Sequence, residues 1–315
     1  MVGSLFIVVD EQIPLAEKVF SKFGNIKLVD GRYIDKEEIK DADVLLVRSV
    51  TKVDRSLLEN SKIKFVGSAT SGIDHVDINY LKKSNICFSY ALGSNANSVA
   101  EYVLNSLFTV TRNVNPPFSL SDKTVGIIGY GNIGSRVKYF MDIFNIKCVL
   151  NDPPLFDQTK NLSFVDLEEV LQSDIITLHV PFTKEGKYPT SNLVNDKFLE
   201  RLKSDVILIN TSRGEIIDEQ ALISFKKRNP ESRLILDVWC NEPNINIDLL
   251  EKVFIGTPHI AGYSYDAKVK ATEILFEALQ NFFKTNFNYS NFSNKNIAFF
   301  PPKLGNSDHL IESII

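Results

Sequence analysis

The chain contains 315 residues, of which 44% are hydrophobic and 23% are charged, and its formal net charge is −4. This length allows one or two globular domains, and the slightly acidic charge offers no electrostatic basis for binding nucleic acid. The N-terminus has no basic region before an apolar core and no apolar run approaches the roughly 18 residues of a membrane span, so neither a signal peptide nor a membrane partner is predicted.

Short apolar runs alternate with helical patterns over residues 1–97. Strands are predicted at residues 5–9, 26–29, 44–47, 65–67 and 86–89. Helical periodicity occurs at residues 15–23 and 37–40. Strands that alternate with helices predict a parallel sheet with helices on both faces. We therefore expect residues 1–97 to form a doubly wound, flavodoxin-like α/β domain.

Polar side chains follow two strands of this first sheet. Arg48 and Ser49 come after the third strand, and residues 68–72, which read SATSG, come after the fourth. Ligands of open parallel sheets bind beyond the carboxyl ends of the strands, so these groups are candidates for holding a phosphate-like anion. The alternative is that Arg48 forms a surface ion pair and that the hydroxyl cluster only caps a helix.

A helix predicted at residues 98–111 bridges to the stretch with the strongest signal, residues 124–152. A buried strand at 125–128 leads into Gly129, Gly131 and Gly134, a helix follows, and a second strand ends at Asp152. This order of strand, G-x-G-x-x-G turn, helix and acidic residue predicts a dinucleotide site, with the pyrophosphate at the helix N-terminus and the acid on the adenosine ribose. Because the charge of Asp152 repels a 2′-phosphate, NAD is favoured over NADP.

Alternation of strands and helices continues to the end of a second domain, predicted at residues 98–285. Strands are predicted at residues 174–180, 206–209, 234–238 and 255–257, and helices at 167–171, 197–202, 218–227 and 266–284. The predicted fold class is therefore α/β, with two doubly wound parallel-sheet domains and a cleft between them. The second is a Rossmann NAD-binding domain, and residues 286–315 are grouped with the first domain as a tail.

NAD implies hydride transfer, and the substrate's hydroxyl proton then needs an acceptor near neutral pKa, which favours histidine. A carboxylate beside the imidazole stabilises its charged form, and an arginine grips a substrate carboxylate with two parallel hydrogen bonds. Arg213, Glu242 and His259 follow successive strands of the second sheet, whose ends converge on one cleft. For the competing His75, His179 and His309, a surface or core position is the expected reading.

Three motifs resemble those of the D-isomer-specific 2-hydroxyacid dehydrogenases: the Gly129 loop with Asp152, NTSRG at 210–214, and DVW at 237–239 leading through Glu242 to PHIAG at 258–262. The resemblance implies that Arg213 binds the substrate carboxylate, that His259 exchanges the proton, and that Glu242 pairs with His259. It also implies that the nicotinamide is bordered by Val180, residues 211–213 and Asp237. The full predicted cofactor-binding set is Gly129, Gly131, Asn132, Ile133, Gly134, Asp152, Val180, Thr211, Ser212, Arg213, Asp237 and Gly262.

Five further segments resemble a branch of this family that oxidises a phosphorylated 2-hydroxy acid: residues 47–53, 65–77, 94–103, 151–154 and 259–264. The implied substrate contacts are Ser49, Thr70 and Tyr263, with Arg48 as a phosphate partner. The family also implies a homodimer and a C-terminal dimerisation domain, which we expect this chain to lack because it stops at Ile315.

Other functions remain open from the sequence alone. The same chemistry could act on another 2-hydroxy acid, such as 3-phosphoglycerate or an unphosphorylated acid. The chain could also be a non-catalytic NAD-sensing module or a structural remnant. Cys87, Cys148 and Cys240 lie far apart and have no metal-binding spacing, so no metal site is predicted and a reducing, cytoplasmic location is expected.

Overall fold

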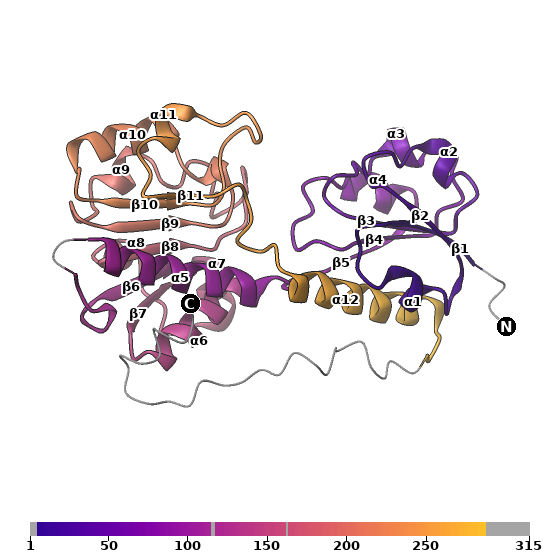
Figure 1. The fold of residues 1–315 in the computed structure, drawn as a ribbon, viewed down its shortest axis with the longest axis horizontal. Helices are drawn as coiled ribbons and strands as arrows, with labels where there is room; N and C mark the ends of the chain where they lie inside the picture. Colours follow the sequence, from indigo (N-terminus) through magenta and orange to yellow (C-terminus); the bar gives the residue numbers. More distant parts are fainter. Residues whose placement is uncertain (1–4, 115–116, 162, 288–315) are drawn as a thin grey trace.

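Two separate parallel sheets organise the chain, and Figure 1 shows them as two domains side by side. The computed structural model describes residues 5–114, 117–161 and 163–287. Among these residues, none of the helices combines the length and the apolar character needed to cross a lipid bilayer.

The first sheet contains five parallel strands in the order β2-β1-β3-β4-β5. The strands are β1 (Leu5–Asp10), β2 (Gly24–Val29), β3 (Val44–Val47), β4 (Phe65–Ser68) and β5 (Cys87–Tyr90). This order is the flavodoxin-like one, as the alternation of elements predicted. All four residues of β3 are buried because helices cover both faces of the sheet at its centre.

Three short helices cover one face of the first sheet: α2 (Lys36–Ile39), α3 (Arg55–Leu58) and α4 (Ile78–Lys83). Each begins after an aspartate whose carboxylate accepts a hydrogen bond from a backbone N–H of the first turn, namely Asp35, Asp54 and Asp77. Of these three short helices, only α2 was predicted from the sequence, and α3 and α4 were not. Their capping aspartates were the available signal.

The opposite face of the first sheet is covered by α1 (Ala16–Phe20) together with the long helix α12 (Tyr265–Phe283). Figure 1 shows α12 beneath this sheet, on the side away from α2, α3 and α4. Leu275, Phe276 and Leu279 are buried in the same cluster as residues of β1, and the Thr272 hydroxyl donates to the Pro14 carbonyl at 2.9 Å.

The predicted domain of residues 98–285 is therefore wrong at α12, which belongs to the core of the first domain. Helical periodicity reveals that a helix has an apolar face but not which sheet receives it. Phe287 also packs on the first domain, with its ring centroid 5.0 Å from that of Phe23. The rest of the predicted tail, residues 288–315, lies outside the described residues.

The second sheet contains six parallel strands in the order β7-β6-β8-β9-β10-β11. They are β6 (Thr124–Ile128), β7 (Lys147–Asn151), β8 (Ile175–Leu178), β9 (Ile207–Asn210), β10 (Arg233–Leu236) and β11 (Ile255–Gly256). The chain leaves β6 first toward β7 and then returns to β8 on its other side. This reversal of direction is the point where open α/β sheets bind their ligands.

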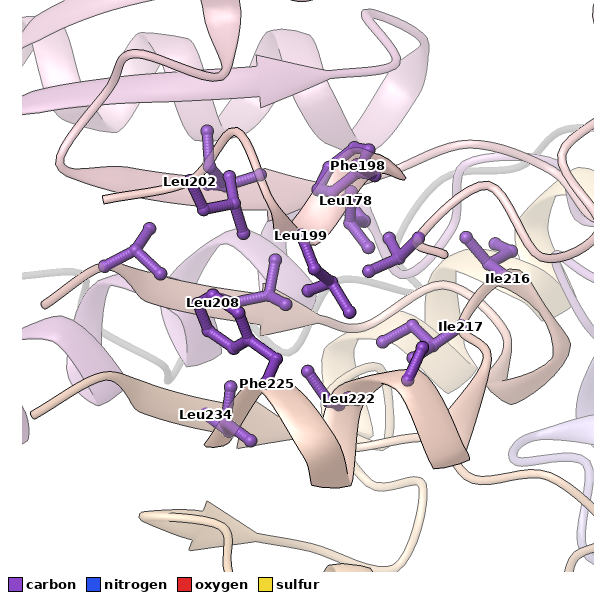
Figure 2. Packing of buried hydrophobic residues seen from close by; sticks show 14 of the residues in the cluster. Leu178, Phe198, Leu199, Leu202, Leu208, Ile216, Ile217, Leu222, Phe225 and Leu234 are labelled. Atoms are coloured by element: carbon purple, nitrogen blue, oxygen red, sulfur yellow. The ribbon is translucent and has the colours of Figure 1, made fainter. Parts of the chain in front are cut away.

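Helices cover both faces of the second sheet. The first face carries α5 (Ala96–Asn113) and α6 (Asn132–Ile143), and α7 (Pro153–Thr159) packs at its edge. The second face carries α8 (Leu167–Val170), α9 (Asp196–Leu199), α10 (Glu219–Arg228) and α11 (Ile247–Leu250). Figure 2 shows the second face, where Leu222 and Phe225 of α10 lie over Leu208 and Leu234 of the sheet. Burial of each such side chain contributes about 1.5–3 kcal/mol.

Two segments join the domains and lie beside each other. One is the start of α5, and the other is the loop that leads into α12. The Ser98 and Ser264 hydroxyls are 2.6 Å apart, and a Cβ on Gly262 would come within 2.4 Å of the Asn95 amide nitrogen. A glycine at position 262 therefore lets the second segment pass directly over the first.

Candidate active site

The three glycines after β6 differ in what surrounds them. Gly129 has a φ of +91°, and a Cβ there would come within 2.6 Å of the His179 carbonyl oxygen. A Cβ on Gly134 would lie 2.0 Å from the Gly129 carbonyl oxygen, so only glycine lets α6 approach the strand so closely. A Cβ on Gly131 would meet nothing within 4 Å. The backbone N–H groups at the start of α6 are therefore open to a pyrophosphate, and the loop fits a dinucleotide.

Asp152 is held at the end of β7, next to the glycine loop. One carboxylate oxygen accepts a hydrogen bond from the Leu155 N–H at 2.9 Å, as the N-cap of α7, and the other accepts from the Tyr130 N–H at 2.7 Å. Each oxygen can accept a second hydrogen bond, which leaves capacity for ribose hydroxyls. Of the other loop residues, Ile133 packs toward the second-domain core, whereas the Asn132 side chain lies beside Gly93.

The loop after β9 forms a second wall of the site. The buried Asn210 shapes this loop, because its amide donates to the Arg213 carbonyl at 2.9 Å and its side-chain oxygen accepts from the Ser212 N–H at 3.0 Å. Thr211 and Ser212 are buried, and Val180 lies beside Gly129 at the end of β8. Desolvation lowers the pKa of His179 to about 3, so this imidazole is too weakly basic to take the substrate's proton at physiological pH.

His259 and Glu242 form a hydrogen-bonded pair. The imidazole Nδ1 lies 2.9 Å from one Glu242 carboxylate oxygen, and the other oxygen accepts from the Trp239 N–H at 2.8 Å. A carboxylate only accepts hydrogen bonds, so Nδ1 carries the hydrogen and Nε2 is left as a lone-pair acceptor. An imidazole oriented in this way can take a proton through Nε2, and Glu242 then stabilises the resulting positive charge.

Asp237 fixes the backbone that carries His259. Its side chain is 1% exposed, and the carboxylate accepts hydrogen bonds from the Thr257 hydroxyl at 2.6 Å and from the N–H groups of Ile260 at 2.7 Å and Ala261 at 2.9 Å. His259 itself has a φ of +56°, a left-handed conformation that is uncommon for a residue other than glycine. The predicted cofactor-binding residue Asp237 thus has a positioning role within the protein.

Arg213 of the second domain contacts Asp74 of the first domain. Its Nε and Nη2 atoms donate to the same carboxylate oxygen at 3.1 and 2.8 Å, and Nη1 donates to the Ser212 carbonyl at 2.7 Å. Partial burial raises the pKa of Asp74, but the charge and hydrogen bonds of Arg213 outweigh it, so this pKa lies below its usual value. The sequence analysis missed Asp74. Its position after β4, in the loop that carries Thr70, was the available signal.

Arg48 lies at the end of β3 and is held by a buried partner. Its Nε donates to Asp10 at 3.0 Å, and the Asp10 side chain is 0% exposed. The predicted alternative of a surface ion pair is therefore wrong, because the acid that Arg48 contacts is in the core. The sequence analysis did not identify Asp10 as this partner, although Asp10 ends β1, the strand next to β3.

Tyr263 lies beside Lys268, and the charge of Arg48 also acts on it. The Lys268 ammonium is 3.6 Å from the centre of the Tyr263 ring. Hydrogen bonding to Lys268, the charge of Lys268 and the more distant charge of Arg48 all lower the pKa of Tyr263. Arg48 and Tyr263 were predicted as substrate contacts from segments far apart in the chain, and in the structure the charge of Arg48 acts on the Tyr263 hydroxyl. Lys268 was missed because the periodicity assigned it only to a helix face.

The hydroxyl groups of the first domain differ in whether they already donate a hydrogen bond within the protein. The Thr70 hydroxyl donates to the Gly72 carbonyl at 2.7 Å, and Ser71 donates to the Asn95 side chain at 2.8 Å. Ser49 is exposed at the end of β3. Ser49 thus presents its hydroxyl to the surroundings, whereas the hydrogen of the Thr70 hydroxyl is already used within its own loop.

Comparisons with known proteins agree with this geometry. The family model for the D-isomer specific 2-hydroxyacid dehydrogenase, NAD binding domain, matches residues 90–261. The chain is 48% identical over 276 residues to the erythronate-4-phosphate dehydrogenase of Hahella chejuensis, which covers 88% of this chain and 72% of that protein. It is 46% identical over 277 residues to the erythronate-4-phosphate dehydrogenase of Escherichia coli O139:H28, covering 88% of this chain and 73% of that protein.

Solved structures with the same fold include two dehydrogenases that contain the cofactor. The D-lactate dehydrogenase of Aquifex aeolicus, complexed with NAD and lactic acid, has a TM-score of 0.73 and 26% identity, covering 89% of this chain and 95% of that one. The NAD-bound 3-phosphoglycerate dehydrogenase of Entamoeba histolytica has a TM-score of 0.76 and 26% identity, covering 92% and 100%. Together with the matched family model and the glycine, arginine and histidine loops, these similarities show that the chain belongs to the D-isomer-specific 2-hydroxyacid dehydrogenase family.

Proposed function

We propose that the protein oxidises the C2 hydroxyl of 4-phospho-D-erythronate to 3-hydroxy-2-oxo-4-phosphobutanoate by hydride transfer to NAD, as a step of pyridoxine and pyridoxal phosphate biosynthesis. The observation that carries this proposal is that each domain presents one arginine after a strand end, with Arg213 also bonded to the first domain through Asp74, and that the second domain adds the His259–Glu242 pair. A phosphorylated hydroxy acid has two anionic ends, and each arginine fits one of them. The name of the relatives that are 46–48% identical supports the same substrate.

In this proposal the residues of the second domain carry out the proton chemistry. The glycine loop and Asp152 would hold NAD, which would supply the acceptor for the hydride that leaves C2. Nε2 of His259 takes the proton of the C2 hydroxyl, so the alcohol loses one hydride and one proton and becomes a ketone. Glu242 keeps Nε2 directed at the cleft and stabilises the imidazolium that forms. Arg213 binds the substrate carboxylate.

The residues of the first domain and of the loop before α12 bind the other end of the substrate. Arg48 uses its terminal nitrogens for the phosphate, since Asp10 occupies its Nε. Tyr263 adds a hydroxyl, and Lys268 beside it adds positive charge. Ser49 and the Thr70 loop contact the substrate hydroxyl groups that lie between the carboxylate and the phosphate. This assignment also distinguishes the two domains by role: the first domain with α12 binds substrate, and residues 96–264 bind NAD.

A substrate panel tests the proposal. NADH formation is followed with 4-phosphoerythronate, erythronate, 3-phosphoglycerate and D-lactate, with NAD and with NADP. We expect kcat/KM for 4-phosphoerythronate to exceed that for erythronate about 100-fold or more, because removal of the phosphate removes the charged group that the terminal nitrogens of Arg48 bind. Equal turnover with and without the phosphate contradicts the substrate assignment, and an absence of NADH with every acid contradicts the enzymatic function.

We further propose that the enzyme acts in the cytoplasm as a homodimer. The cytoplasm suits the three cysteines, which are all free thiols. The dimer follows the family resemblance, and light scattering of the purified protein tests it. A single monomeric species at micromolar concentration contradicts the dimer without affecting the proposed chemistry.

A further inference from the structure

Some N–H groups of Arg213 are hydrogen-bonded within the protein, and these bonds fix the direction in which the remaining N–H groups point. A guanidinium has five N–H donors. Asp74 accepts one from Nε and one from Nη2, and the Ser212 carbonyl accepts one from Nη1. Two N–H groups remain, one on each terminal nitrogen. They are the pair that can grip both oxygens of a carboxylate, so the contact with Asp74 decides which way this pair faces.

The loop that carries Asp74 is shaped around the guanidinium. A Cβ on Gly72 would lie 2.2 Å from Nη2 of Arg213 and 3.2 Å from the Asp74 oxygen that Arg213 contacts. Glycine at position 72 therefore leaves the space into which the guanidinium fits. The φ of Gly72 is not in the left-handed region, so the absence of a side chain matters here for space and not for backbone conformation.

A directional chain of hydrogen bonds holds this loop. The Thr70 hydroxyl donates to the Gly72 carbonyl at 2.7 Å, so it accepts its 2.7 Å contact from Ser68. Ser68 then has no hydrogen left for His75 and accepts from the imidazole Nε2 at 2.9 Å. Burial lowers the pKa of His75, so the ring is neutral, and the tautomer with its hydrogen on Nε2 makes this hydrogen bond. Asp74 thus projects from a loop that is anchored in its own domain.

We propose that Asp74 is a positioning residue that directs the free N–H pair of Arg213 toward the substrate carboxylate. The inference rests on the proposed oxidation of a 2-hydroxy acid and adds that carboxylate binding by the second domain depends on a side chain of the first. Asp74 could instead act through its charge and compete with the substrate for Arg213. Its side chain is 66% exposed and that of Arg213 31%, so water screens the attraction between them, and orientation is the larger effect.

Two substitutions at position 74 distinguish orientation from charge. Asp74→Ala removes the acceptor and the charge, whereas Asp74→Asn removes the charge but keeps an oxygen that can accept both hydrogen bonds. If Asp74 positions Arg213, Asp74→Ala raises the KM for the hydroxy acid about 10- to 100-fold with a much smaller change in kcat, and Asp74→Asn stays within about 3-fold of wild type. A lower KM in both variants, or an unchanged KM in Asp74→Ala, overturns the proposal.

Gly72→Ala provides an independent test that leaves every charge in place. The added methyl group displaces the end of the flexible Arg213 side chain, and we expect a rise in KM similar to that of Asp74→Ala. Asp41→Ala is the matched control, because Asp41 forms an ion pair with Lys62 at 2.7 Å in the same domain and, among the residues that the structure describes, forms no ion pair with the second domain. The control should keep the wild-type KM, and all variants should keep the wild-type melting temperature and NAD affinity.

The activity of the wild-type protein tests the proposed function, and this test is separate from the test of Asp74. If wild type prefers another D-2-hydroxy acid, the variants are compared on that acid, because every such substrate carries the carboxylate that Arg213 binds. If wild type oxidises none of them, the proposed function fails, and binding of 4-phosphoerythronate to the NAD-loaded protein is measured by calorimetry instead. Equal affinity of wild type and Asp74→Ala, or no binding to either, then overturns the role of Asp74.

Discussion

Each domain carries one of the two arginines assigned to the substrate, and the aspartates that bind them differ in burial and in the domain to which they belong. Arg48 donates to Asp10, which is 0% exposed and belongs to the same domain. Arg213 donates to Asp74, which is 66% exposed and belongs to the other domain. The first arginine is therefore oriented as soon as its domain folds. The second is oriented only when the two domains lie together. Binding of the substrate carboxylate by Arg213 is therefore coupled to the domain arrangement, whereas binding by Arg48 is not.

The surroundings of Asp10 explain why Arg48 is held so firmly. The other Asp10 oxygen accepts from the Gln12 N–H at 2.9 Å, and a Cβ on Gly31 would collide with the carboxylate at 2.0 Å. The Thr51 hydroxyl donates to the Gly31 carbonyl at 2.6 Å and keeps this segment against the carboxylate. Buried charges persist only when they are paired and hydrogen-bonded, and Asp10 satisfies both conditions.

The largest expected effect comes from removing His259, the proposed proton acceptor, while the residues that bind NAD are left in place. His259→Ala removes the proton acceptor of the second domain, so we expect kcat to fall by about 10²–10⁴-fold. NAD affinity should remain close to wild type, because the glycine loop is untouched. Stopped-flow measurement of NADH formation, with NAD binding followed by protein fluorescence, checks both parts. If turnover stays within a few-fold of wild type, the general base lies elsewhere and the division of roles between the two domains is wrong.

Removal of Arg48 tests whether the first arginine is part of the fold as well as of the site. Arg48→Met leaves the Asp10 carboxylate buried without its cationic partner, and we expect the free energy of unfolding to fall by about 3 kcal/mol. Denaturant titration of the purified variant measures this loss. Arg55→Met, which breaks the exposed pair with Glu59 in the same domain, is the control and should leave the unfolding midpoint unchanged. Equal midpoints for both variants contradict the structural role of Arg48.

Arg213→Lys addresses the second arginine, for which the expected effect is on activity and not on stability. An ammonium cannot replace the planar fork, so kcat/KM should fall by about 10- to 100-fold while the melting temperature stays constant. Arg201→Lys, at a surface pair with Glu168, is the matched control with no expected change. A melting temperature that falls as much as that of Arg48→Met would show that the two arginines have the same structural role.

The smallest expected effect concerns the cofactor end of the cleft. Asp152→Ala removes the ribose acceptor and should raise the Kd for NAD about tenfold, with a smaller preference for NAD over NADP. The same substitution also removes the N-cap of α7, so Asp166→Ala, which removes the N-cap of α8, controls for the loss of a helix cap. Calorimetric titration with both cofactors is the measurement. Unchanged affinities for NAD and NADP contradict the role assigned to Asp152.

The local motifs were the most predictable part of this protein. The glycine loop, the strand before it and Asp152 lie within residues 124–152, and their order in the chain sets their geometry. The pairing of His259 with Glu242 was implied by the family resemblance, and their positions after the last strands of one sheet predicted that they share one site. Such predictions succeed because the carboxyl ends of parallel strands meet at one edge, whatever the details of packing.

The partners of the two arginines and the place of α12 could not be predicted in the same way. Asp10 lies at the end of a strand and Asp74 in the loop after one, which marks them as near a site, but no local pattern in the sequence shows which arginine each of them meets, or that Lys268 lies against Tyr263. The apolar face of α12 follows from its periodicity, but its burial against β1 depends on the return of the chain past Asn95.

The amino-acid sequence by itself determined two parallel sheets, the dinucleotide loop and the loops that carry Arg213 and His259. Each of these depends on residues close together in the chain, where backbone geometry and hydrophobic period leave few alternatives. Only the tertiary structure decided that Asp74 meets Arg213 and that α12 completes the first domain. Those contacts join residues 139 or more positions apart: the first depends on how the two domains pack together, and the second on the return of the chain to the first sheet.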